Sequence, residues 1–127
     1  MRMQGLRDRT KQFALRVIRM YGALPKEAAA QVIGKQVLRS GTSVAANFRE
    51  ASRARSENEF IAKLGTVEQE LDETLLWFEL LIESGMVPAS KLNSLHSEGE
   101  ELLKIVVAAV KRTKARKLRP GQKQDQP

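Results

Sequence analysis

The chain has 127 residues, enough for one domain with a substantial apolar core. It has no cysteine and one histidine, His96, which excludes a disulfide framework, a thiolate nucleophile and a histidine-rich metal site within one chain. The net charge is +7, aromatic residues make up only 5%, and there are only 4 prolines, a composition typical of an all-α protein.

Segments that would direct the chain to a membrane are not indicated. The longest uninterrupted apolar run, Ile105 to Val110, is far shorter than the ~20 residues that span a bilayer. The N-terminal residues include several arginines but no apolar stretch of signal-peptide length. We therefore expect no membrane partner, and the lack of cysteine agrees with a cytoplasmic location.

The first predicted helix covers about residues 6–22, and Gly22 and Pro25 mark its end. Pro25 suits the first turn of a second helix, predicted at about 26–54, because a missing N–H is tolerated there. The core positions recur every three or four residues in both helices: Leu6, Phe13, Val17, Met20 and Leu24, then Ile33, Val37, Val44 and Phe48.

Two glycines lie seven residues apart in the second predicted helix, Gly34 and Gly41. Each costs about 1 kcal/mol of helix stability relative to alanine. Their placement on one face suggests the close approach of another helix. The other interpretation is a local bend or break near Ser40 and Gly41.

The third predicted helix begins at Ser56, where Ser56 and Glu59 form a capping box, and ends at Gly85. The fourth covers about 88–117, and we expect residues 118–127 to be a disordered, polar and basic tail. Residues 1–117 thus form one domain. Four amphipathic helices with short connections predict an antiparallel up-down-up-down four-helix bundle. The core positions of the last two helices are Phe60, Leu64, Val67, Leu71, Leu75, Phe78 and Ile82, then Leu92, Leu95, Leu102, Val106 and Val110.

Charge is distributed unevenly along the chain. Residues 56–85 contain eight acidic residues and one lysine, whereas residues 111–127 contain seven lysines or arginines and one aspartate. The predicted third helix is therefore acidic, and the C-terminal end of the fourth is strongly basic.

Two polar stripes lie beside the core positions of the second and third helices. Their residues are Gln36, Arg39, Ser43, Asn47 and Glu50, then Lys63, Thr66, Glu70, Glu73 and Trp77. Glu70 and Glu73 could be metal ligands, but carboxylate sites in bundles also use Glu-x-x-His units on two helices, and this chain has one histidine. General acid–base catalysis has no accompanying nucleophile or oxyanion site.

We favour a structural reading of these stripes. In it, Glu70 and Glu73 accept hydrogen bonds from Arg39, Lys63 or Asn47, within one chain or between chains. Trp77 is a core residue or an interface anchor, since tryptophan is enriched at interface hot spots. We expect no cofactor, no metal and no enzymatic activity.

The segments LRSGTSVAANFREASRARSENEFIAKL and EQELDETLLWFELL resemble a family of four-helix-bundle proteins first met in intervening sequences of large-subunit ribosomal RNA genes. The resemblance covers about residues 36–86, and two positions depart from it: Gln69 where lysine is usual, and Leu76 where tyrosine is usual. The matching positions are Arg39, Ser43, Asn47, Glu50, Phe60, Lys63, Glu70, Glu73, Thr74, Trp77, Glu79 and Leu80.

The resemblance implies a ring-like homopentamer. It also implies kinship to the accessory proteins of diversity-generating retroelements, which are basic pentameric bundles that bind a reverse transcriptase and nucleic acid. It implies no established biochemical activity. The polar-stripe residues Arg39, Ser43, Asn47, Glu50, Lys63, Glu70, Glu73 and Trp77 are expected to share a structural or interface role.

Five copies of a basic tail would form a dense cationic array that binds RNA or DNA through phosphate contacts, without sequence preference. The expected nucleic-acid-binding residues are Lys111, Arg112, Lys114, Arg116, Lys117 and Arg119, aided by Arg7, Arg9, Lys11 and Arg16. Such a protein could be an accessory factor to a nucleic-acid enzyme. Two alternatives remain: a protein-interaction scaffold without a nucleic-acid role, and a solvated helix end whose cations favour the C-terminal dipole. A basic amphipathic helix on a membrane surface ranks behind both, because the last predicted helix turns polar on every side beyond Val110.

Overall fold

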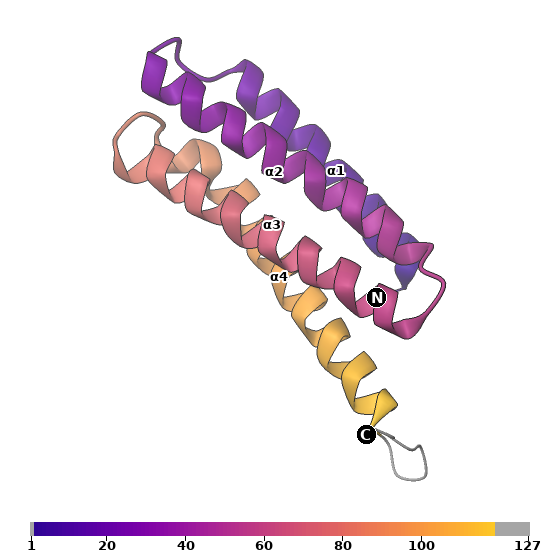
Figure 1. The fold of residues 1–127 in the computed structure, drawn as a ribbon. Helices are drawn as coiled ribbons and strands as arrows, with labels where there is room; N and C mark the ends of the chain where they lie inside the picture. Colours follow the sequence, from indigo (N-terminus) through magenta and orange to yellow (C-terminus); the bar gives the residue numbers. More distant parts are fainter. Residues whose placement is uncertain (1, 119–127) are drawn as a thin grey trace.

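Four α-helices account for nearly all of residues 2–118, the part of the chain that the structure, a computed structural model, describes. They are α1 (Met3–Gly22), α2 (Ala28–Ser52), α3 (Glu57–Glu83) and α4 (Ala89–Lys117). Successive helices run in opposite directions and are joined by short connections (Figure 1). No strand occurs within residues 2–118, so the predicted all-α, four-helix fold is confirmed.

The start of α2 differs from the prediction. Glu27 has extended backbone angles, and α2 begins at Ala28, so the placement of Pro25 in its first turn is wrong. The Gln31 side-chain amide donates a 2.8 Å hydrogen bond to the Pro25 carbonyl, which holds the connection against the first turn of α2. A side chain therefore shapes this helix start, which the proline rule alone could not anticipate.

The two ends of α3 follow the sequence signals. The Ser56 hydroxyl accepts a 3.0 Å hydrogen bond from the Glu59 backbone N–H, and the Glu59 carboxylate accepts one from the Arg55 backbone N–H. At the other end Gly85 has φ +83°, a left-handed conformation that glycine adopts without a Cβ clash. The Met86 N–H then reaches back to the Leu81 carbonyl, which closes the helix end.

The core is one apolar cluster to which all four helices contribute. Most of the predicted core positions are buried, and Met20, Ile33, Phe60, Ile82 and Val110 pack against the cluster while partly exposed. Phe13 and Phe78 meet edge to face at its centre, with ring centroids 6.4 Å apart. Leu81 and Val87 are buried as well, although the helical spacing did not single them out.

The close approach of α1 and α2 depends on glycine. The helix α2 continues without interruption through Ser40 and Gly41, so the expected alternative of a break there is wrong. A Cβ at Gly41 would lie 2.8 Å from a Val17 methyl group, closer than carbon atoms tolerate. At Gly34 the crowding comes from Leu24 and Tyr21. The spacing of the two glycines thus marks the close contact between α1 and α2.

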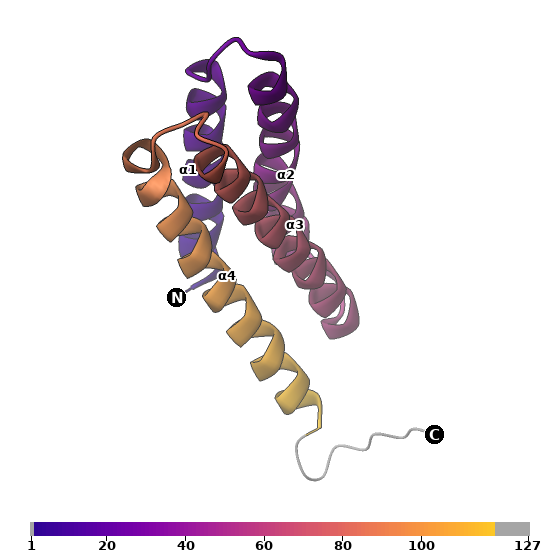
Figure 2. The same ribbon diagram turned by 90° about the vertical axis from the view of Figure 1, so that its left-hand side faces the viewer.

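The contact between α1 and α4 is the smallest among the neighbouring helices. Arg9 on α1 donates two hydrogen bonds to the Glu98 carboxylate on α4, at 2.8 and 3.0 Å. This hydrogen bonding raises the pKa of Arg9, aided by the charges of Glu98 and Glu101 and opposed by burial. Beyond this point the C-terminal half of α4 runs away from α1 and α2 (Figure 2).

Candidate functional site

The polar stripes of α2 and α3 meet along one seam of the bundle. At its centre the hydroxyls of Ser40 and Thr74 are 2.7 Å apart and fully buried. Thr74 donates its proton to the Glu70 carbonyl, so Ser40 donates to Thr74. Ser40 was not among the predicted seam residues, although a small polar residue on the core side of an amphipathic helix is a signal that could have identified it.

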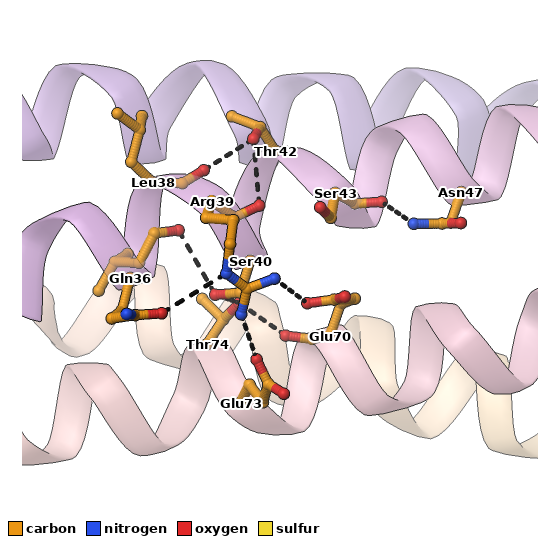
Figure 3. Close-up of polar contacts among 11 residues, drawn as sticks. Gln36, Leu38, Arg39, Ser40, Thr42, Ser43, Asn47, Glu70, Glu73 and Thr74 are labelled. Carbon is orange, nitrogen blue, oxygen red and sulfur yellow. Dashed lines mark hydrogen bonds and ion pairs between the residues drawn. The ribbon is translucent and has the colours of Figure 1, made fainter.

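Arg39 bridges two carboxylates of α3 on the outer side of this seam (Figure 3). Its guanidinium is 2.5 Å from Glu73 and 3.4 Å from Glu70. The hydrogen bond to Glu73 raises the pKa of Arg39, and the charges of Glu70 and Glu73 raise it further, against the opposing effect of burial. Arg39 is 51% exposed and Glu70 only 18%, so the network lies at the rim of the core and is partly screened by water.

The remaining polar-stripe residues divide into separate contacts. Lys63 pairs with Glu50 at 2.5 Å, not with Glu70 or Glu73, and this hydrogen bond and the Glu50 charge raise the pKa of Lys63. Asn47 donates to the Ser43 backbone carbonyl on its own helix. The stripes therefore link α2 to α3 at two places. Arg39 pairs with Glu70 and Glu73, and Glu50 pairs with Lys63.

Trp77 packs against the core from the same stripe. Its indole Nε1 is buried and has no hydrogen-bond partner among residues 2–118. A buried donor without an acceptor is costly. This donor distinguishes Trp77 from the other core aromatic residues.

The basic end of α4 divides into paired and unpaired cations. Arg116 pairs with Glu57 at 3.0 Å, and Lys117 donates a hydrogen bond to Asn58, so both bridge to the start of α3. Lys111, Arg112 and Lys114 are exposed and have no side-chain partner within the described chain. Arg119 lies outside the described residues.

The auxiliary cations predicted on α1 are also divided. Arg9 and Arg16 face α4, where Arg9 binds Glu98 and Arg16 donates to the Ser94 hydroxyl at 2.9 Å. Arg7 and Lys11 lie on the other side of α1, toward α2. The structure therefore does not bring the four α1 cations to one surface with the end of α4.

The polar residues between α2 and α3 form ion pairs and hydrogen bonds. In residues 2–118 no three His, Asp or Glu side chains gather as metal ligands would. His96 lies between Glu79 of α3 at 2.9 Å and Glu100 of α4 at 3.6 Å, a bridge that sequence reasoning missed because the three residues come from two helices. No described helix combines the length and the hydrophobicity needed to cross a bilayer.

These features define a class: all-α proteins of four antiparallel helices with a charged seam and a basic C-terminal helix end. The chain belongs to the 23S rRNA-intervening sequence protein family, whose pattern matches residues 6–108. The match extends the predicted resemblance from the two central helices into α1 and α4.

A solved structure from Bacteroides thetaiotaomicron VPI-5482 is similar to this chain. It is described as a protein with unknown function from the S23 ribosomal protein family. The two chains are 36% identical, with a TM-score of 0.81 over 87% of this chain and 99% of that one. A comparison with curated proteins finds no match.

Proposed function

We propose that this protein is a non-enzymatic homo-oligomer, a ring of five copies, that binds RNA or DNA without sequence preference. The basic end of α4 is the contact surface. In the cell the protein acts in the cytoplasm as an accessory factor beside a nucleic acid or a nucleic-acid enzyme. Membership of the family supports the four-helix fold. The positive charge at the end of α4 supports nucleic acid as the ligand.

The observation that carries the proposal is the position of Lys111, Arg112 and Lys114. All three are exposed, and no carboxylate of the described chain neutralises them. They belong to the C-terminal half of α4, which runs away from α1 and α2 (Figure 2) and whose last turn is bonded to the start of α3. Cations that project from a fold and lack partners are suited to phosphate contacts, whose binding energy comes from counterion release.

Exposed apolar side chains support the assembly of several copies. Leu76 and Leu80 of α3 are 48% and 39% exposed, one helical turn apart. The stretch Ile105–Val110 of α4 is apolar on every side, and most of its side chains are partly exposed. A neighbouring copy that covers these residues would remove them from water.

The test is RNA affinity measured by fluorescence anisotropy with a labelled mixed-sequence RNA. The variant Lys111→Gln/Arg112→Gln/Lys114→Gln should lose at least about tenfold in affinity, with a salt slope smaller by about 2 because three contacts are removed. The control Lys26→Gln/Lys35→Gln/Lys91→Gln removes the same charge from exposed positions elsewhere. Equal affinity of the two variants would refute binding through the end of α4.

A protein-interaction scaffold is the second candidate, and a pocket favours it. The pocket, about 520 Å³, lies where the α1–α2 and α3–α4 connections meet. Its lining includes the apolar residues Met20, Leu24, Met86 and Leu92 and the cations Arg16, Arg19 and Lys91. Methionine side chains adapt to the shape of a partner. A specific protein partner bound there, with no RNA retained, would favour the scaffold.

A further inference from the structure

A second basic surface lies at the same end of the bundle as the end of α4, in the groove between α1 and α2. The groove has a volume of about 480 Å³. Four cations line it, Arg7 and Lys11 from α1 and Arg49 and Arg53 from α2 or just beyond its end. The small side chains of Ala45 and Ala46 also line it. Arg49 and Arg53 were not among the predicted site residues.

The positive charge of this groove is not neutralised by the rest of the described chain. Neither the ion pairs nor the side-chain hydrogen bonds of residues 2–118 include the side chains of Arg7, Lys11, Arg49 or Arg53. The one carboxylate on the rim, Glu50, is bound by Lys63 at 2.5 Å. The groove therefore carries a net local charge that attracts anions.

Arg7 provides an independent sign that an acceptor is missing. Its Nε is buried and has no hydrogen-bond partner among the described residues. A buried guanidinium N–H without an acceptor is costly, because it has lost water and gained nothing in return. An anion in the groove, met by a reoriented Arg7 side chain, would remove this cost.

The spacing of the cations fits a polymer of negative charges. Arg7 and Lys11 are four residues apart on α1, and so are Arg49 and Arg53, which places the two members of each pair about 6 Å apart along the helix axis. The small side chains of Ala45 and Ala46 let a nucleic-acid backbone approach closely. The groove also offers no aromatic or large aliphatic anchor of the kind that protein interfaces use.

We propose that the groove between α1 and α2 is a second phosphate-backbone site, which grips one strand of nucleic acid through Arg7, Lys11, Arg49 and Arg53. This inference rests on the proposed nucleic-acid function and adds to it a site separate from the end of α4. Binding there is electrostatic and independent of sequence.

The experiment measures the affinity of the full chain for a labelled mixed-sequence single-stranded RNA across a salt series, by fluorescence anisotropy. In the variant Arg49→Gln/Arg53→Gln we expect about a tenfold loss of affinity at 0.1 M salt and a slope reduced by about 1.4, as two phosphate contacts disappear. The control Lys26→Gln/Lys35→Gln loses the same charge from the other end of the same helix pair and should bind within about twofold of wild type.

The possible outcomes distinguish a failure of the groove proposal from a failure of the proposed nucleic-acid function. If the groove variant matches the control while wild type binds RNA, the groove inference is wrong and the function stands. If wild type binds no RNA, the proposed function fails and the groove proposal with it. If the groove variant changes the native mass of the assembly and leaves RNA affinity intact, the groove is a contact between copies, and the proposal is overturned.

Discussion

The seam between α1 and α2 and the C-terminal half of α4 are both regular helix, yet they are held in different ways. At the seam, Gly41 lets Val17 approach so closely that no side chain fits between the helices. The last turns of α4 leave α1 and α2, and the side chains of Arg116 and Lys117 tie them to the start of α3 (Figure 2). Apolar packing thus holds α1 against α2, whereas the end of α4 is held by charged side chains and exposes positive charge to solvent.

The largest effect is expected from Gly41→Ala. The new Cβ would meet the stiff, fully buried Val17 at 2.8 Å, and overpacking of this kind costs about 1–3 kcal/mol, more than the gain in helix propensity. The control Gly65→Ala has nothing within 4 Å of its added carbon and should stabilise α3 by about 0.5–1 kcal/mol. Urea denaturation measures both changes in the free energy of unfolding. A stabilised Gly41→Ala protein would show that α1 and α2 are not closely packed at Val17.

The hydroxyl pair between α2 and α3 should give the next effect. Thr74→Val leaves the buried Ser40 hydroxyl with only the Val37 carbonyl at 3.5 Å, a loss of about 1–2 kcal/mol. In the double variant Ser40→Ala/Thr74→Val the loss should be smaller than the sum of the two single losses, by about 0.5–1 kcal/mol. Thr113→Val is the control, since Thr113 bonds only to the Ala109 carbonyl of its own helix. Strict additivity in thermal unfolding would mean that the two hydroxyls are not coupled.

A smaller effect is expected at the contact of α1 with α4. Arg9→Gln removes a two-bond ion pair with Glu98 whose side chains are about one quarter exposed, and should cost about 1 kcal/mol. A double-mutant cycle with Glu98→Gln isolates the pair. A coupling energy near zero would show that this ion pair does not help to hold α4 against α1.

The smallest effect is expected at the end of α4. Arg116 and Glu57 are both about half exposed, so Arg116→Gln should change the unfolding free energy by no more than about 0.5 kcal/mol. Chemical denaturation of this variant beside Arg9→Gln compares two ion pairs of α4 directly. A larger loss of unfolding free energy in Arg116→Gln than in Arg9→Gln would contradict this account. It would mean that the end of α4 contributes to the stability of the bundle.

Much of the fold followed from sequence because apolar spacing and helix-end signals are local. Ser56, Glu59 and Gly85 marked the ends of α3, and the spacing of Gly34 and Gly41 indicated a close helix contact. These signals depend on residues a few positions apart, so one chain is enough to recognise them.

The side-chain partners were harder to predict, because they depend on the rotation and register of each helix. Arg39 joins Glu70 and Glu73 as one of the expected pairings, whereas Lys63 reaches Glu50 instead. The groove cations Arg49 and Arg53 could not be grouped with Arg7 and Lys11 until the antiparallel contact of α1 with α2 was known. The interface role of the polar stripes stays a prediction.

Native mass spectrometry of the protein, purified without nuclease at moderate salt, tests the central claim most directly. We expect a mass of five chains carrying heterogeneous nucleic acid, as a ring with exposed cations at α4 and in the α1–α2 groove would. A single chain with nothing bound would contradict both the assembly and the nucleic-acid function, and would leave Arg39, Glu70, Glu73 and Trp77 as residues of intrachain packing only.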